Sequence, residues 1–477
     1  MRNKIVFYLN GKRQEVGADH AGMMLADYLR YEKNLTGTKI VCSEGDCGSC
    51  SVLRYFPQAK GTDTNNYLAI NSCITVVANL DGSSLVTVDA LKDKSELHEA
   101  QKAMVKCHGS QCGFCTPGFV VALTGLVEEK MARKETTVSS QEAKNCMTGN
   151  LCRCTGYQPI IDAALTMDIK KAESVKERFF STHQRDRLNE DFKVGVALES
   201  DEFSYAAPKT IKEALDYLAS NPDTRIVGGS TDLGVVHNKR KITLTKLLSL
   251  HLISELYETS MTSDEVTIGA RVTFSEFRHF IKDTCSELAH YLDIFACPQI
   301  KNLATVVGNI ANASPIGDMP PALLALNASL IINGTKEVLL SDFFLAYRKT
   351  ALMAGEIVTG IKFKLPKTDS DFKLYKNSNR KDLDISAVNL GIHVEWKDKT
   401  KKSIQEITIA AGGVAATPLR LKQTEDFLKT NLDIEAAVKI LNSEFQPLSD
   451  VRATSAYRHV LIENFFRRFF AECGGVK

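Results

Sequence analysis

Residues 42–50 read CSEGDCGSC, which places Cys42, Cys47 and Cys50 in one short loop at the spacing C-x4-C-x2-C. A fourth cysteine, Cys73, follows downstream. Plant-type [2Fe–2S] loops have this spacing, because two irons need four thiolates that converge on a small volume. Two glycines inside the loop let the backbone fold tightly around a cluster. A zinc site is the alternative, although zinc favours C-x2-C pairs on separate knuckles.

A second group of cysteines follows as two close pairs, Cys112 with Cys115 at C-x2-C and Cys152 with Cys154 at C-x-C. A proline lies shortly after each pair and begins a segment with helical periodicity, as is typical of the first turn of a helix. Two helix N-termini would then point at one cluster, and their partial positive charge would favour its reduced state. The spacing by itself leaves a zinc site open.

The cysteines are concentrated in the first third of the chain, where ten of the thirteen lie between residues 42 and 154. The length of the chain and the short apolar run before residue 10 argue against a secreted disulfide scaffold. We therefore expect a cytoplasmic protein whose clustered cysteines bind metal. Cys107 and Cys146 lie near the second group but outside the two pairs, and we interpret them as buried small apolar residues.

The composition is typical of a soluble globular protein. Of the 477 residues, 44% are hydrophobic and 24% are charged, and the length suggests about three domains. The formal net charge is only +2, from 59 basic and 57 acidic residues, which argues against nucleic-acid binding through bulk charge. No apolar run approaches the ~18 residues of a transmembrane helix, so we expect no membrane association.

Changes of pattern along the chain indicate an α+β protein of several domains. Asn10 and Gly11 predict a hairpin turn after a first strand, and residues 21–32 carry apolar side chains at helical spacing. From about residue 203, strands and helices alternate between Gly-rich turns. The predicted divisions are a small strand-rich unit at 1–91, a helical unit at 92–168, a linker at 169–200, an α+β domain at 201–370 and a C-terminal α+β domain at 371–477.

The cysteine motifs resemble the iron–sulfur domain of the xanthine dehydrogenase family of molybdenum hydroxylases. The matching stretches are CSEGDCGSCSV at 42–52, HGSQCGFCTPG at 108–118 and GNLCRCTGYQP at 149–159, with Ser49 and Ser51 where the family often has Ala and Thr. The resemblance implies a β-grasp ferredoxin-like domain and then a helical [2Fe–2S] domain, and it removes the zinc alternative. It implies two [2Fe–2S] clusters, one held by Cys42, Cys47, Cys50 and Cys73 and one by Cys112, Cys115, Cys152 and Cys154.

Residues 226–233, IVGGSTDL, resemble the first flavin loop of the same family, with Ser230 where the family has Asn. A strand that runs into paired glycines can present backbone N–H groups to a pyrophosphate. Taken alone, however, a Gly-Gly pair is also typical of an ordinary turn. The contacts to FAD that the resemblance implies in this loop are Ile226, Val227, Gly228, Gly229, Ser230, Thr231, Asp232 and Leu233.

Residues 304–318, ATVVGNIANASPIGD, resemble the second flavin loop. The resemblance implies a two-part, PCMH-like α+β FAD-binding domain and a C-terminal flavoprotein domain. Read without it, Phe295 and Val358 are candidate core residues and Lys376 is a candidate solvated lysine. The further FAD contacts that the resemblance implies are Thr305, Gly308 and Asn309 at the phosphates, Asp318 at the sugar, and Phe295, Val358 and Lys376.

The resemblance implies an electron relay without a catalytic side chain on this chain. A molybdopterin-binding large subunit would oxidise hypoxanthine and xanthine to urate and pass electrons through the two clusters to FAD and then to NAD⁺. Because the chain ends at Lys477, where full-length members continue into a molybdopterin domain, we expect that centre on a separate chain, in a heterotetramer or larger assembly. No G-x-G-x-x-G follows a strand, so a Rossmann-type NAD site is not predicted.

Two other functions remain open from the sequence. The same cofactors would serve the iron–sulfur and FAD subunit of a relative that acts on aldehydes, carbon monoxide or other N-heterocycles, although those relatives commonly use separate chains. The other alternative is a redox-sensing scaffold, which would bind no FAD and oxidise no NADH.

Overall fold

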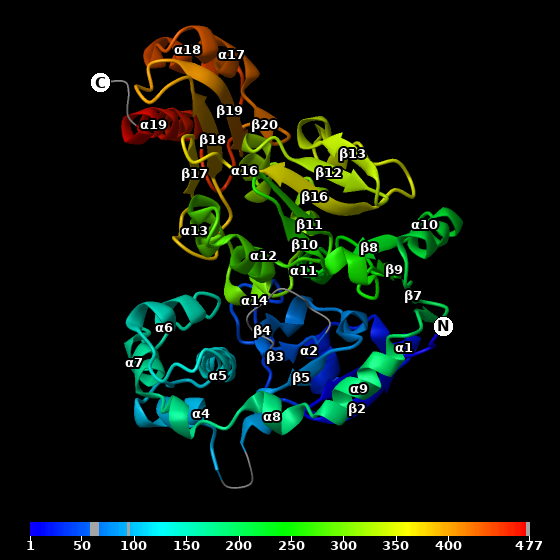
Figure 1. Ribbon diagram of the computed structural model, residues 1–477. Coiled ribbons are helices and arrows are strands. Elements are labelled where there is room, and N and C mark those ends of the chain that lie inside the picture. Colours follow the sequence, from blue (N-terminus) through cyan, green and yellow to red (C-terminus); the bar gives the residue numbers. More distant parts are fainter. Residues whose placement is uncertain (58–65, 93–95, 474–477) are drawn as a thin grey trace. The chain divides into compact units, whose positions relative to one another are not determined.

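The computed structural model describes residues 1–57, 66–92 and 96–473. It divides into two compact units, which are described separately (Figure 1). The first contains Met1–Ser254 together with Cys297–Ala304, and the second contains Glu255–Ala296 and the chain from Thr305 onward. Within the described residues, no helix combines the length and the apolar character that crossing a membrane requires.

The first unit begins with the predicted hairpin, in which Asn10 and Gly11 have φ of 51° and 77°. Positive φ at both central residues is what a tight hairpin turn requires. The five-stranded sheet has the order β2-β1-β5-β3-β4, with β1 parallel to β5, and this confirms the predicted β-grasp fold. The strands are β1 (Ile5–Leu9), β2 (Lys12–Val16), β3 (Ser51–Tyr55), β4 (Leu68–Asn71) and β5 (Ser84–Val86).

The segment between β2 and β3 is less regular than a single helix over 21–32. It forms α1 (Ala18–Ala21), α2 (Leu25–Asp27) and a turn of π-helix (Tyr28–Glu32). Leu25 and Leu29 are nevertheless fully buried against the sheet, so the apolar spacing identified the buried face correctly. A short 3-10 helix, Ser72–Ile74, carries Cys73.

The helical unit packs on this sheet. Figure 1 shows α4, α6 and α7 around α5, which is buried along most of its length. Apolar residues of α5, such as Phe119 and Leu123, share one hydrophobic core with Leu53 of β3 and Val86 of β5. The two cluster-bearing domains are therefore one packed body. The helices are α4 (Glu99–Lys106), α5 (Thr116–Ala132), α6 (Ser140–Cys146) and α7 (Gln158–Thr166).

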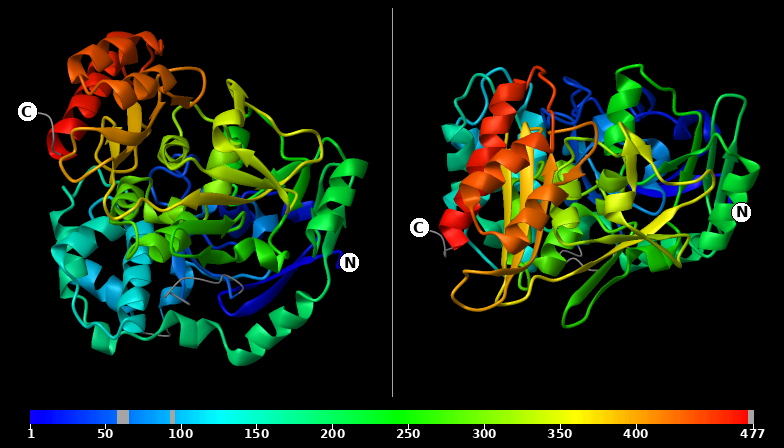
Figure 2. Two further views of the ribbon diagram at one scale, coloured as in Figure 1. Left: turned by 45° about the horizontal axis from the view of Figure 1, so that its top comes forward. Right: turned by 90° about the horizontal axis from the view of Figure 1, so that it is seen from above.

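The expected linker contains regular structure. Helix α9 lies along the β1–β2 hairpin (Figures 1 and 2), where Asp191 accepts two hydrogen bonds from Arg13. Strand β6 pairs with β7 and so joins the next sheet, whose order is β6-β7-β9-β8. These elements are α8 (Val175–Phe179), α9 (Thr182–Asp191), β6 (Val196–Glu199), β7 (Ser204–Ala207), α10 (Ile211–Ser220), β8 (Arg225–Val227), α11 (Thr231–Asn238) and β9 (Lys246–Ser249).

The second unit contains two larger sheets, ordered β10-β11-β16-β12-β13 and β17-β18-β19-β20. Helix α16 (Met319–Ala325) is buried throughout and packs on β18 and β19. The C-terminal helices α17 (Lys422–Thr430), α18 (Ile434–Ser443) and α19 (Ser455–Cys473) share the core of the second sheet. Its strands are β17 (Asp371–Asn377), β18 (Val388–Trp396), β19 (Ile404–Gly412) and β20 (Leu419–Arg420).

The remaining elements of the second unit are shorter. Its first sheet consists of β10 (Thr259–Met261), β11 (Glu265–Gly269), β12 (Ser329–Ile332), β13 (Lys336–Leu339) and β16 (Val358–Lys364), and a small hairpin consists of β14 (Phe344–Ala346) and β15 (Lys349–Thr350). The helices that precede α16 are α12 (Phe274–Ile281), α13 (Ser286–Ile294) and α15 (Val306–Ala311), while α14 (Pro298–Lys301) belongs to the first unit.

Candidate cofactor sites

The structure brings the four cysteines of the first group together. The thiol of Cys42 is within hydrogen-bonding reach of Cys47 and Cys73, and Cys50 is within reach of Cys73. Cys42 is half-buried and the other three are buried. Hydrogen bonds from the Cys47 and Cys73 thiols lower the pKa of Cys42, and the backbone N–H of Glu44 lowers it further. A thiolate is the form of cysteine that binds metal.

Glycines make the close approach between the two cluster domains possible. Gly48 has a φ of 70°, and a Cβ there would lie 2.2 Å from the carbonyl oxygen of Gly149. A Cβ at Gly118 would lie 2.2 Å from the carbonyl oxygen of Gly48. Leu151 donates its N–H to Cys47 O at 3.0 Å, across the same boundary. Gly118, which follows the Cys112–Cys115 pair, and Gly149, which precedes the Cys152–Cys154 pair, therefore allow their backbones to pack directly against the first cysteine loop.

The second group of cysteines also converges. The Sγ of Cys154 lies 3.7 Å from that of Cys112 and 3.9 Å from that of Cys152. Cys115 is within hydrogen-bonding reach of Cys152. Burial and the neighbouring Cys152 raise the pKa of Cys115 to about 12. For Cys152, burial raises the pKa, but hydrogen bonds from Thr155, from the backbone of Cys154 and from the Cys115 thiol together lower it to about 7.

Two helices begin beside this group of cysteines, as the positions of the prolines in the sequence predicted. Helix α5 begins directly after Cys115 and α7 begins at Gln158, each with a proline in its first turn. The hydroxyl of Tyr157 accepts the N–H of Cys152 at 3.0 Å and so holds the C-x-C loop. Cys107 and Cys146 are half-buried rather than buried, and they pack against the domain core.

Each of the two sets of thiols is a compact group of sulfur donors. No group of three or more His, Cys, Asp or Glu side chains in the described residues already has the geometry to hold a metal ion. Each set instead provides four thiols from one small volume, which is the donor set of a [2Fe–2S] cluster. The cysteine side chains of both sets therefore supply the sulfur donors that a [2Fe–2S] cluster requires.

The first flavin loop connects β8 to α11 in the first unit. A Cβ at Gly229 would lie 1.9 Å from the carbonyl oxygen of Leu303, so only glycine fits there. Ser230 follows with a φ of 67°, and its buried hydroxyl has no hydrogen-bond partner among the described residues. An unpaired hydroxyl at the start of a helix is a suitable contact for a bound phosphate. The side-chain amide of Asn79, in the ferredoxin-like domain, donates to Gly228 O at 3.1 Å.

The second flavin loop lies in the second unit. Thr305 caps α15, because its hydroxyl accepts the N–H of Gly308 at 3.0 Å. The side-chain oxygen of Asn309 is buried and has no partner in the described part of the chain. Both flavin loops thus contain a buried polar atom without a partner among the described residues, and such atoms favour a bound polar ligand such as FAD.

The structure brings Asp318 and Lys376 together, 58 residues apart in the sequence. The ammonium of Lys376 lies 2.8 Å from Asp318 Oδ2, and its side chain is only 3% exposed. The interpretation of Lys376 as a solvated lysine is therefore wrong, because the buried carboxylate pairs with it. Ser386 and Asn389 donate to the other oxygen of Asp318. The predicted sugar contact by Asp318 stays a prediction.

The two apolar contacts predicted for flavin are buried in the second unit. Phe295 lies with its ring centroid 4.3 Å from that of Phe274, and Val358 begins β16. Both residues satisfy the core interpretation, and their flavin contacts remain predictions.

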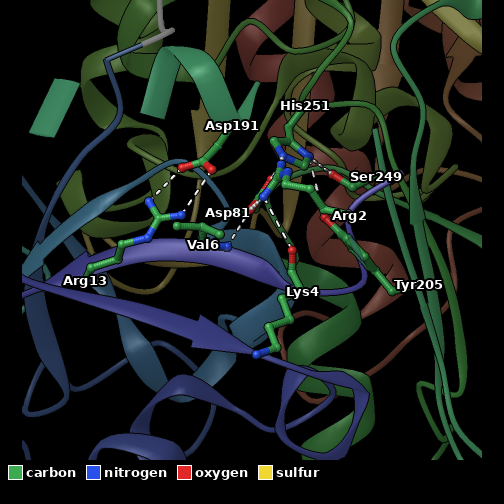
Figure 3. Close-up of polar contacts among 9 residues, drawn as sticks. All are labelled: Arg2, Lys4, Val6, Arg13, Asp81, Asp191, Tyr205, Ser249 and His251. Carbon is green, nitrogen blue, oxygen red and sulfur yellow. Dashed lines mark hydrogen bonds and ion pairs between the residues drawn. The ribbon is translucent and has the colours of Figure 1, made fainter. Parts of the chain in front are cut away.

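A buried polar network, which the sequence did not reveal, centres on Asp81. This side chain is fully buried and accepts two hydrogen bonds from Arg2, at 2.8 and 2.9 Å, and one from Val6 N–H at 2.7 Å. Its Oδ2 also lies 2.9 Å from Nε2 of His251 (Figure 3). Burial raises the pKa of Asp81, but hydrogen bonds from His251 and Arg2 lower it by more, to about 2.

The network continues from His251 to the sheet that carries the first flavin loop. Its Nδ1 lies 3.0 Å from Ser249 Oγ and 3.5 Å from the Tyr205 hydroxyl (Figure 3). Ser249 of β9 pairs with Val227 of β8, the residue before the glycines. The ferredoxin-like domain therefore anchors the flavin loop through buried charge. The only local sequence signal was an Asp-Gly pair, which is typical of a turn.

Comparisons with known proteins agree with this arrangement. The matching family models are "2Fe-2S iron-sulfur cluster binding domain" at residues 7–78, "[2Fe-2S] binding domain" at 87–165, "FAD binding domain in molybdopterin dehydrogenase" at 201–367 and "CO dehydrogenase flavoprotein C-terminal domain" at 373–473. These matches fit an iron–sulfur and FAD electron-transfer subunit of a molybdenum hydroxylase.

Similar curated proteins include xanthine dehydrogenase 1 of Arabidopsis thaliana, at 28% identity, and xanthine dehydrogenase/oxidase of Mus musculus, at 29%. Each alignment covers 98% of this chain and 39% of the relative. The chain thus spans about two fifths of the length of the curated relatives it matches.

Solved structures with a similar fold include chains from two named enzymes. Carbon monoxide dehydrogenase from Hydrogenophaga pseudoflava matches with a TM-score of 0.53 and 23% identity, over 57% of this chain and 96% of that one. Quinoline 2-oxidoreductase from Pseudomonas putida 86 matches with a TM-score of 0.51 and 24% identity, over 58% and 98%. At these identities the likeness concerns the fold.

Proposed function

We propose that this chain passes electrons from a molybdopterin-binding partner through two [2Fe–2S] clusters to FAD and then to NAD⁺, in an enzyme that oxidises hypoxanthine and xanthine to urate. The observation that carries the proposal is the convergence of two four-thiol sets within one packed body. Bound clusters carry single electrons, and bound FAD converts between one-electron and two-electron transfer.

The exposure of the cysteines supports the order of the relay. Cys112 and Cys154 are exposed, so the cluster of the helical domain is the one that a partner can approach. The first set is more deeply buried, and its domain contacts the flavin loop of the same unit, where Asn79 bonds Gly228. Electrons would therefore enter at the helical domain and leave through the ferredoxin-like domain.

The chain's own residues would hold the cofactors rather than perform acid–base chemistry. We assign the eight cysteines as cluster ligands and the two flavin loops as the FAD site. Ser230 and Asn309 would supply polar contacts to FAD, since each has a buried atom without a partner among the described residues. Lys376 would act through Asp318, whose carboxylate it holds in place. No catalytic side chain is assigned.

The purine substrate is supported by the curated relatives, which are named xanthine dehydrogenases and match nearly the whole chain. The fold neighbours named for carbon monoxide and quinoline support the alternative, a related enzyme that acts on one of those substrate classes. The partner chain would select the substrate in either case. We propose a cytoplasmic location for the assembly.

The test is the cofactor content of the purified chain, followed by anaerobic addition of NADH with EPR detection. About four irons, four acid-labile sulfides and one FAD per chain, with two distinct reduced-cluster signals, are expected for two [2Fe–2S] centres. Zinc in place of iron, or a chain without flavin, would contradict the relay. Co-purification with the molybdopterin partner and assays with xanthine, carbon monoxide and quinoline then separate the substrate alternatives.

A further inference from the structure

Helix α11 connects the first flavin loop to the first cluster loop. Its N-terminus follows Ser230, and its last residue is Asn238. Along its length it packs closely on the segment that carries Cys73, since a Cβ at Gly234 would lie 2.3 Å from the carbonyl oxygen of Ile74. An eight-residue helix is about 12 Å long, so one rigid element joins the two sites.

The side-chain amide of Asn238 forms hydrogen bonds with the backbone beside two of the cluster cysteines. Its Nδ2 donates to Ser43 O and to Cys73 O, both at 2.8 Å. An asparagine amide has two N–H donors, so both are used. The carbonyls come from parts of the chain 30 residues apart, and a single amide group holds them at a fixed separation.

One of these carbonyls belongs to a peptide group that contacts a cluster cysteine. The Ser43–Glu44 peptide accepts from Asn238 at its oxygen and donates from Glu44 N–H to Cys42 Sγ at 3.4 Å. In a trans peptide the C=O and the N–H point in opposite directions from one planar unit. The three groups therefore form a chain, Asn238 amide to peptide to thiol. Hydrogen bonds in such a chain polarise and strengthen one another.

We infer that Asn238 is a positioning residue that raises the reduction potential of the cluster at Cys42, Cys47, Cys50 and Cys73 by polarising the Ser43–Glu44 peptide. The inference rests on the proposed function, because it requires a cluster at this site. Hydrogen bonds to cluster sulfurs favour the reduced state, which carries one more negative charge. A stronger Glu44 N–H donor to Cys42 shifts the potential upward.

The test is an anaerobic redox titration of the full chain carrying the Asn238→Leu substitution, with dithionite as reductant and EPR as the readout. The substitution removes both donors, nearly conserves size and changes no charge. At a fixed potential, the reduced-to-oxidised ratio of this cluster should fall threefold to tenfold, where tenfold is about 59 mV for a one-electron couple. The cluster at the second group of cysteines should shift less than twofold.

Asn221→Leu is the matched control. Asn221 also ends a helix in the first unit, α10, but its amide donates to Tyr217 O at 3.0 Å within that helix. Both cluster potentials should be unchanged in this variant. An Asn238→Leu chain with full iron content and an unshifted potential would overturn the inference.

If Asn238→Leu fails to retain its cluster, Asn238→Ser replaces it in the titration. A serine hydroxyl can donate to only one carbonyl, so a smaller shift in the same direction is expected, and an unshifted potential contradicts the inference. A wild-type chain without two cluster signals would instead contradict the proposed function. The two failures are therefore distinguishable.

Discussion

The two cluster-bearing domains differ in how their cysteines meet the rest of the chain. In the ferredoxin-like domain three of the four ligand candidates are buried, and the loop is enclosed by Gly118, Gly149 and the end of α11. In the helical domain Cys112 and Cys154 are exposed, and their loops lead into the starts of α5 and α7. One region surrounds its site with tertiary contacts and the other builds it from local structure, so substitutions should disturb them unequally.

The largest expected effect is the loss of a cluster. Cys47→Ser should remove one EPR signal and about half of the iron while FAD content stays intact, because neither flavin loop contains a cluster cysteine. Cys152→Ser should remove the other signal. Metal binding and folding are coupled, so the buried site should lose more thermal stability than the exposed one. Loss of FAD from Cys47→Ser would show that the domains are not independent.

Two glycine substitutions distinguish the stability cost of close packing around the first cysteine loop from the cost of backbone strain alone. Gly48 and Gly113 both have positive φ, of 70° and 84°. A Cβ at Gly113 meets only Ser110 Oγ at 4.0 Å, so Gly113→Ala should cost only the strain, about 1–2 kcal/mol of unfolding free energy. Gly48→Ala also collides with the Gly149 backbone and should cost about 1–3 kcal/mol more. Denaturant unfolding measures both, and equal losses would refute the enclosure of the first loop.

The Asp81 network should matter more than an ion pair nearer the surface. Asp81→Asn leaves Arg2 and His251 without their buried carboxylate and should lower the free energy of unfolding by about 3–5 kcal/mol. Asp191→Asn, which breaks the partly exposed pair with Arg13, is the control and should cost about 1 kcal/mol or less. Comparable losses in urea titrations would mean that burial does not distinguish the two pairs.

The smallest expected effect is a pH dependence. The pKa of Asp81 is lowered from its ordinary value of 3.8 to about 2. A lowered carboxyl pKa stabilises the folded state above pH 3.8, and that contribution is lost as the pH falls toward 2. Between these values the wild type should lose stability more steeply than Asp81→Asn. Parallel pH profiles of the melting temperature would show that Asp81 does not titrate as its contacts indicate.

Local signals in the sequence predicted much of the fold. The Asn-Gly turn and the helices that begin near Pro117 and Pro159 are present as expected. The short helix α6 and strand β17 were not identified, and residues 21–32 form irregular helical turns instead of one helix. Those segments depend on packing against distant elements, which overrides weak local preference.

The candidate sites divide in the same way. Cysteine spacing alone marked both four-thiol sets, because three ligands of one set and both close pairs of the other are neighbours in the chain. Lys376 looked like a surface lysine because its partner, Asp318, is 58 residues away. Asn79, Asn238 and Asp81 gave no local sign of a role, since their partners are separated from them by 149, 195 and 170 residues.

The sequence by itself therefore predicted the cofactor types, through cysteine spacings and through motifs whose resemblance to a known family implied the second cluster and FAD. Only the tertiary structure decided how the cluster loop, the flavin loop and the buried Asp81 are held to one another. Such contacts join side chains and carbonyls that are distant along the chain, and their energy depends on burial, which no local pattern records.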